Sequence, residues 1–100
     1  MQQQDLEALT NNAKQAANLL KAMANENRLM ILCTLVNGEL SVNELNEQVP
    51  LSQSALSQHL ANLKKAGLVD TRRQSQAIFY RLQGDHAMRV IHVLKDIYCN

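Results

Sequence analysis

The chain has 100 residues, 46% of them hydrophobic, and a formal net charge of +1. This length fits a single domain over residues 1–100, and the hydrophobic fraction excludes a disordered chain. No apolar run approaches the roughly 18 residues of a membrane span, and the N-terminal residues lack the basic and apolar segments of a signal peptide. We therefore expect a cytoplasmic protein with no membrane partner.

Two helices are predicted at the start of the chain. Apolar residues at three- and four-residue spacing predict a first helix over residues 5–23, with a stripe formed by Leu6, Leu9, Ala13, Ala16, Ala17 and Leu20. Asn25 is a suitable N-cap for a second helix over residues 26–36. That helix is apolar nearly all round, which predicts that it is buried.

Two short helices joined by a tight turn are predicted next. Ser41 and Glu44 have the spacing of a capping box at the start of a third helix, over residues 41–48. Ser52 is a suitable cap for a fourth helix over residues 53–66. Three leucines on one face of this fourth helix are expected to point inward: Leu56, Leu60 and Leu63.

A β-hairpin and a last helix complete the predicted fold. Residues 69–73 and 77–82 resemble strands on either side of a polar tripeptide. Asp85 is expected to cap a helix over residues 86–98, whose apolar surface exceeds what one small core needs, so part of it should contact a partner. The predicted order is α-α-α-α-β-β-α, a mainly α fold with a small β-hairpin.

Positive charge is concentrated in one third of the chain. Residues 51–84 balance to +4, whereas residues 1–50 balance to −3 and residues 85–100 to zero. Localised positive charge is typical of a protein that binds nucleic acid. An ordinary solvated surface explains the same charges about as well.

Two short helices followed by a hairpin make a winged helix-turn-helix, which binds DNA. Near the start of the fourth helix, short polar side chains are placed to reach base edges: Gln53, Ser54, Ser57 and Gln58. Basic side chains are placed to hold backbone phosphates: Lys64, Lys65, Arg72 and Arg73. For any one of the four polar residues, the alternative is an ordinary solvated helix face.

Several segments resemble the ArsR/SmtB family of repressors, and the resemblance extends over nearly the whole chain. They are Leu20-Lys21-Ala22-Met23-Ala24, Arg28-Leu29, Leu51-Ser52-Gln53-Ser54-Ala55-Leu56-Ser57-Gln58-His59-Leu60 and Lys65-Ala66-Gly67-Leu68-Val69. The resemblance implies a homodimer through the first and last helices, a fourth helix in the major groove and a hairpin that serves as the wing. A two-fold dimer in turn implies double-stranded DNA with a near-palindromic operator.

Many members of that family sense metals, and this chain departs from their ligand patterns. Where one metal site uses Cys-Val-Cys, this chain has Ser41-Val42-Asn43, and hydroxyl and amide groups are poor substitutes for thiolates. The candidate ligands of a second site lack the required spacing: Asp85, His86 and His92. His59 fits a half-buried or phosphate-contacting residue better than a metal ligand. We expect no metal and no other cofactor.

The two cysteines match positions in the HlyU, BigR and YgaV subgroup, whose members respond to reactive sulfur and oxidants through two thiols. Cys33 lies in the second helix and Cys99 in a terminal Tyr-Cys pair. The resemblance implies a redox switch in which linking Cys33 to Cys99, either directly or through extra sulfur atoms, changes the relative pose of the two DNA-binding units. Alternatively, Cys33 is only a small hydrophobe and Cys99 an idle thiol, in a repressor that senses a metal or another inducer.

The sequence therefore predicts a DNA-binding transcription regulator, either a repressor or a protein that displaces a silencer. A thiol enzyme has little support, because the chain has no Cys-x-x-Cys motif and no Gly-rich phosphate loop. A module that binds only other proteins leaves the basic residues of the 51–84 segment unexplained.

Overall fold

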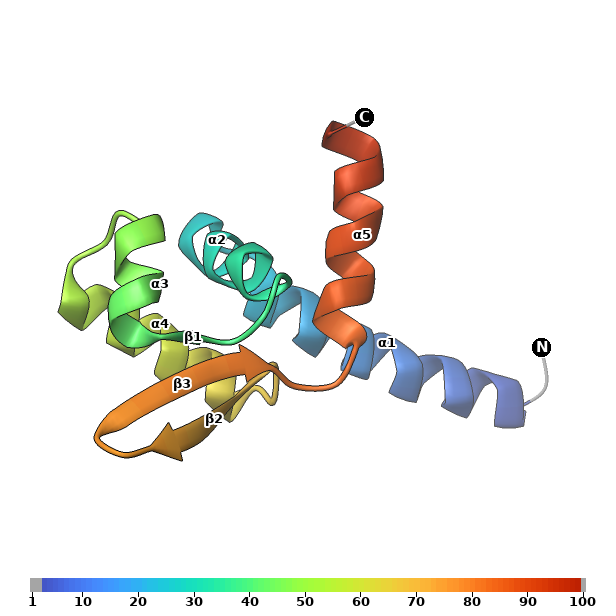
Figure 1. Cartoon of the computed structure of the whole chain (residues 1–100). Helices are drawn as coiled ribbons and strands as arrows, with labels where there is room; N and C mark the ends of the chain where they lie inside the picture. Colours follow the sequence, from blue (N-terminus) through green and yellow to red (C-terminus); the bar gives the residue numbers. More distant parts are fainter. Residues whose placement is uncertain (1–2, 100) are drawn as a thin grey trace.

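The computed structural model describes residues 3–99, which form five helices and three strands (Figure 1). In chain order they are α1 (Gln3–Met23), α2 (Glu26–Leu35), β1 (Leu40–Ser41), α3 (Val42–Gln48), α4 (Gln53–Lys65), β2 (Val69–Gln74), β3 (Ala77–Leu82) and α5 (His86–Tyr98). This order confirms the mainly helical winged helix-turn-helix predicted from the sequence. No helix within residues 3–99 is both long and apolar enough to cross a membrane.

The hydrophobic core is built around α2, which packs against α1, α3, α4 and α5. Ile31, Leu32 and Leu35 of α2 are buried, whereas Met30 is exposed, so the predicted burial of this helix is confirmed on one side only. Burying a side chain of this size stabilises a fold by about 1.5–3 kcal/mol. The three leucines predicted to face inward from α4 are fully buried as well: Leu56, Leu60 and Leu63.

Three of the four predicted helix caps are confirmed by hydrogen bonds. The Asn25 side chain accepts hydrogen bonds from two backbone amides in the first turn of α2. Ser41 and Glu44 form the capping box of α3, and the Ser52 hydroxyl accepts a hydrogen bond from a backbone amide in the first turn of α4. Asp85 occupies the N-cap of α5, but its carboxylate makes no capping hydrogen bond. Its backbone (φ −120°, ψ 0°) lacks the extended conformation of the other three caps, so the prediction was wrong on this bond.

The strands form one antiparallel sheet in the order β1-β3-β2. The hairpin of β2 and β3 was predicted, whereas β1 was not, because two residues are too few for an alternating pattern. In β1, Leu40 pairs with Tyr80 and Ser41 with Phe79. The wing is therefore joined to the segment that leads directly into α3.

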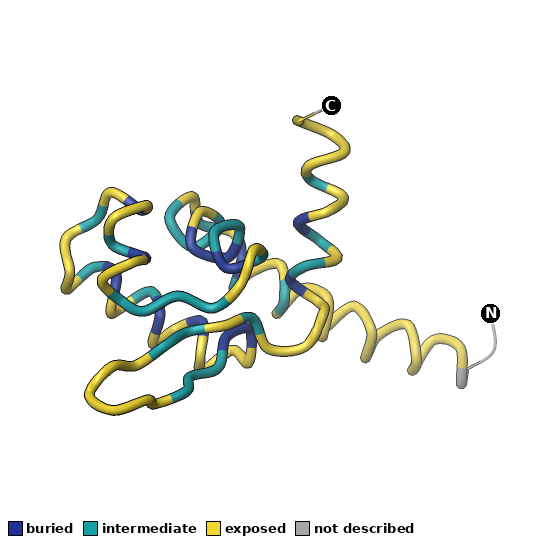
Figure 2. The backbone as a smooth tube through the Cα atoms, in the orientation of Figure 1, coloured by how far each residue is buried: buried dark blue, intermediate teal, exposed yellow. Residues whose placement is uncertain are grey.

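The predicted apolar stripe of α1 does not face the core of this chain. Leu6, Leu9 and Leu20 are each more than half exposed, and Figure 2 shows that most residues along this helix are exposed. A neighbouring face packs on the core instead, through Leu19, Ala22 and Met23. The spacing predicted the helix correctly, because the period of 3.6 residues is the same whichever molecule covers the stripe.

Candidate DNA-binding interface

The turn between α3 and α4 is held by a side chain that the sequence analysis missed. The Asn46 side-chain amide donates to the carbonyl oxygen of Leu51 at 2.7 Å, and the Leu51 amide donates to the carbonyl of Val49 at 2.8 Å. Val49 is fully buried. These contacts fix the angle between the two helices, and an Asn four residues before Pro50 was the available sequence signal.

The first two turns of α4 present a polar outer face. The four predicted base-contacting residues are all exposed and lie next to one another on the helix surface: Gln53, Ser54, Ser57 and Gln58. The opposite face is anchored in the core by leucines, so the outer face cannot rotate inward. The amides of the first turn also make the start of α4 favourable for a phosphate. The arrangement fits the recognition helix that the sequence predicted, and both this role and the contacts of its side chains with bases stay predictions.

His59 lies at the border between the two faces of α4. It is half-buried, and its Nδ1 atom is buried without a hydrogen-bond partner in the described part of the chain. A metal ligand needs partners, and residues 3–99 contain no cluster of three His, Cys, Asp or Glu side chains that could hold an ion. This environment fits a packing residue whose other ring nitrogen remains available for a hydrogen bond.

The predicted phosphate-binding side chains lie around α4 and the wing, in different environments. Lys64 Nζ donates to Thr71 Oγ1 of β2 at 3.1 Å, while Lys65 and Arg73 are exposed. Arg72 is instead engaged by Glu39, to which its Nε donates at 3.0 and 3.2 Å. The hydrogen bond from Arg72 holds the pKa of the Glu39 carboxyl below its usual value, so the pair is fully ionised at neutral pH.

The two cysteines lie on helices that pack against each other, α2 and α5. Both thiols are free; Cys33 is half-buried against the core, and Cys99 is exposed at the C-cap of α5. Ile91 is the last fully buried residue of α5, so Cys99 lies about 12 Å farther along the helix axis. The end of α5 thus projects beyond the core, as Figure 1 shows.

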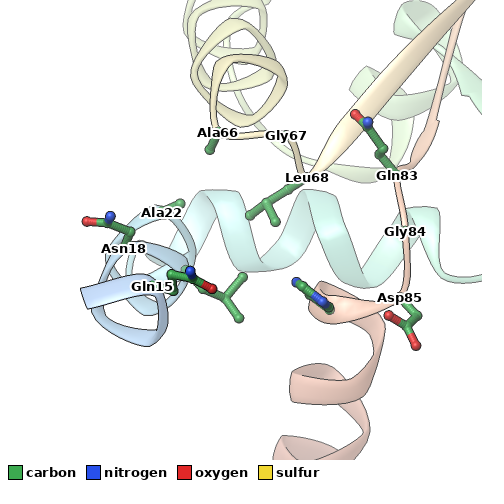
Figure 3. Close-up of a pocket in the computed structure, with 11 residues that line it drawn as sticks. Gln15, Asn18, Ala22, Ala66, Gly67, Leu68, Gln83, Gly84 and Asp85 are labelled. Atoms are coloured by element: carbon green, nitrogen blue, oxygen red, sulfur yellow. The ribbon is translucent and has the colours of Figure 1, made fainter. Parts of the chain in front are cut away.

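An open region separates α1 from α5 and the loop before it. A hollow of about 580 Å³ lies between α1, the segment around Gly67 and the loop around Asp85 (Figure 3). It adjoins a groove of about 470 Å³ between α1 and α5, and the two share Gln15, Leu19 and His86. Val93 lies in the groove, and Ile97 follows it one turn later on α5; both are more than half exposed.

Comparison with known proteins places this helix-turn-helix in a family. Residues 25–71, which contain α2, α3, α4 and the start of β2, match the family model described as bacterial regulatory protein, arsR family. The chain is 50% identical over 95 residues to the transcriptional activator HlyU of Vibrio cholerae serotype O1, covering 95% of this chain and 88% of that protein. This chain belongs to the ArsR family.

Other relatives agree over the full length of the fold. A biofilm growth-associated repressor of Agrobacterium fabrum is 48% identical over 94 residues, covering 94% of this chain and 80% of that protein. The structure of reduced HlyU from Vibrio cholerae has a TM-score of 0.87 at 50% identity, covering 94% of this chain and 99% of that one. The structure of the repressor BigR from Xylella fastidiosa has a TM-score of 0.87 at 43% identity, covering 100% and 99%. This ArsR-family chain is a DNA-binding transcription regulator.

Proposed function

We propose that this ArsR-family protein binds a near-palindromic operator in double-stranded DNA as a cytoplasmic homodimer, and that linking Cys33 to Cys99 lowers its affinity for that operator. The observation that carries the DNA-binding part is the construction of α4. Its leucines fix one face in the core, its exposed polar residues occupy the other, and basic side chains lie at its end and on the wing.

In this proposal α4 enters the major groove. Gln53, Ser54, Ser57 and Gln58 contact base edges, while Lys64, Lys65 and Arg73 hold backbone phosphates. In the same proposal, the other ring nitrogen of half-buried His59 donates to a phosphate. Base contacts carry sequence preference, whereas phosphate contacts carry affinity and its salt dependence.

Replacing Gln58 by Ala should relax sequence preference and weaken operator binding by on the order of 1–3 kcal/mol, because one pair of base contacts is lost. Arg73→Gln is the matched comparison, because it is expected to weaken binding to all DNA sequences alike. It should also reduce the salt slope, which is the slope of log affinity against log salt concentration, by about one. Binding of operator and scrambled duplexes across a salt series measures both effects. If Arg73→Gln changed sequence preference instead, the two roles would be wrongly assigned.

The homodimer is supported by apolar surface that this chain leaves uncovered on α1 and α5. Leu6, Leu9 and Leu20 on α1, and Val93 and Ile97 on α5, are each exposed by 52–60%. Apolar groups gathered on two neighbouring helices are typical of a surface that a partner covers. A second copy of the chain supplies the same apolar surface and places a second α4 for the other half of a palindrome.

The thiol switch is supported by the position of two free cysteines on adjacent helices, one at the proposed dimer interface and one behind the helix-turn-helix. With hydrogen peroxide, one thiol becomes a sulfenic acid and releases water; the other thiol then displaces a second water to give the disulfide. Hydrogen disulfide, a reactive sulfur species, is an alternative oxidant. It takes up two electrons and two protons from the two thiols and is released as two molecules of hydrogen sulfide. One structure of a relative is described as reduced HlyU, so a reduced form of that relative has been distinguished, as the proposal requires for this chain.

Selection of bound genomic fragments tests the whole proposal. We expect the reduced protein to select fragments with two inverted half-sites about one helical turn apart, and to select far fewer after treatment with peroxide or hydrogen disulfide. Named relatives include an activator and a repressor, so the position of these fragments relative to promoters separates direct repression from displacement of a silencer. Fragments without a repeated half-site would contradict the dimer.

A further inference from the structure

Arg72 of β2 uses every nitrogen of its guanidinium group within the protein. Nε and Nη2 both donate to the Glu39 carboxylate, and Nη1 donates to Gln74 Oε1 at 2.7 Å. The guanidinium carbon also lies 4.8 Å from the centre of the Phe79 ring. A forked pair between Arg and a carboxylate is among the stronger polar contacts in proteins, so a DNA phosphate that took over the fork would have to displace the Glu39 carboxylate.

The sheet register places Arg72 on the face opposite to α4. Arg72 is paired with Phe79, and their neighbours Thr71 and Arg73 are paired with Tyr80 and Ile78. Successive side chains of a strand point to opposite faces. Thr71 accepts a hydrogen bond from Lys64 of α4, so Thr71 and Arg73 lie on the α4 side and Arg72 on the other side.

The ion pair joins parts of the chain that the sheet alone connects weakly. Glu39 directly precedes β1, which is only two residues long and leads into the capping box of α3. Because the strand order is β1-β3-β2, the contact between Glu39 and Arg72 crosses the middle strand over Phe79. It therefore ties the far strand of the wing to the start of the helix-turn-helix.

We propose that Arg72 is a positioning residue and not a phosphate ligand: with Glu39 and Phe79 it fixes the wing relative to α3 and α4, so that Arg73 meets the DNA backbone at a set distance from the recognition helix. The proposal rests on the proposed binding of DNA by α4 and the wing. It replaces the role that the sequence suggested for Arg72.

The test compares four variants by titration of an operator duplex of about 30 base pairs over a salt series. Glu39→Gln and Arg72→Gln each remove the ion pair, Arg72→Lys keeps the charge without the fork, and Arg73→Gln is the matched control on the neighbouring residue. We expect the first three to lower affinity by a similar factor, about fivefold or more, with an unchanged salt slope. Arg73→Gln alone should reduce the slope by about one.

The double variant Glu39→Gln/Arg72→Gln should bind no more weakly than either single variant, since both remove one contact. Amide hydrogen exchange should quicken in β2 and β3 but not in α4, which distinguishes a displaced wing from general unfolding. A Glu39→Gln protein that binds DNA more tightly or with a steeper salt slope would show that Arg72 was released to hold a phosphate, and would overturn the proposal. So would a reduced slope in Arg72→Gln, or unchanged affinity in all three variants.

The control variants also distinguish a failure of the positioning role of Arg72 from a failure of the proposed DNA-binding function. If Arg73→Gln and Gln58→Ala leave DNA binding unchanged, the proposed interface itself is wrong. If they act as expected while Arg72→Gln reduces the slope as Arg73→Gln does, only the positioning role fails.

Discussion

Replacing Val93 and Ile97 together by Asp is expected to convert the protein to a monomer and to lower its affinity for the operator at least about 100-fold. The two side chains lie one turn apart on the same face of α5, where Val93 lines the groove toward α1, and are exposed by 58% and 60%. Two carboxylates there would be buried without partners against a second copy, which strongly opposes association. A monomer engages one half-site, and each lost bidentate base contact costs about 1–3 kcal/mol.

Lys95→Glu is the matched control for this double variant. It changes the net charge by the same amount on the same helix, but it lies about 200° around the helix from Val93, and its side chain is exposed. Sedimentation at micromolar concentration should show a dimer for the wild type and for Lys95→Glu, and a monomer for the Asp variant. Because both Asp positions are already exposed in a single chain, its helical circular dichroism should be retained. A folded Asp variant that remained dimeric would place the interface elsewhere.

The path of the backbone was largely predictable, because local signals in this chain agree with one another. The capping box at Ser41 and Glu44, the cap at Ser52 and the leucine spacing of α4 all indicate the same two helices, and the structure confirms them. Asp85 shows the limit of such signals: the residue type suits an N-cap, but the incoming loop sets a backbone conformation that directs the side chain elsewhere.

The candidate site was predictable only in part. Exposure of Ser54 and Gln58 follows from helical periodicity, which places them opposite the buried leucines, whereas Gln53 lies about 20° from Leu60 around the helix and is exposed because it begins α4. The ion pair of Arg72 could not be predicted, because its partner Glu39 is 33 residues away and the β1 strand that brings them together has no sequence pattern. The same holds for Asn46, whose contact depends on how α3 and α4 cross. Contacts between distant segments need the fold first.

Removing either thiol should abolish the response to oxidants while leaving DNA binding intact. Linking Cys33 to Cys99 ties the end of α5, part of the proposed dimer interface, to α2 behind the helix-turn-helix. Couplings of this kind typically change affinity by about 5- to 150-fold, so treated wild-type protein should lose operator affinity by a factor in that range. Cys99→Ser is the cleaner variant, because Cys99 is exposed in the single chain and its replacement disturbs no packing within that chain.

Cys33 packs against the core, so Cys33→Ala accompanies Cys33→Ser to separate the loss of a thiol from the cost of a half-buried hydroxyl. Intact mass should show the loss of two hydrogens in treated wild-type protein, within one chain, and no such loss in the variants. Peroxide also oxidises methionine, and Met30 is partly exposed; the double variant Cys33→Ser/Cys99→Ser treated in parallel measures that contribution. If this double variant still released DNA after treatment, the thiol pair would not be the switch, and the protein would be an ArsR-family regulator with a different inducer.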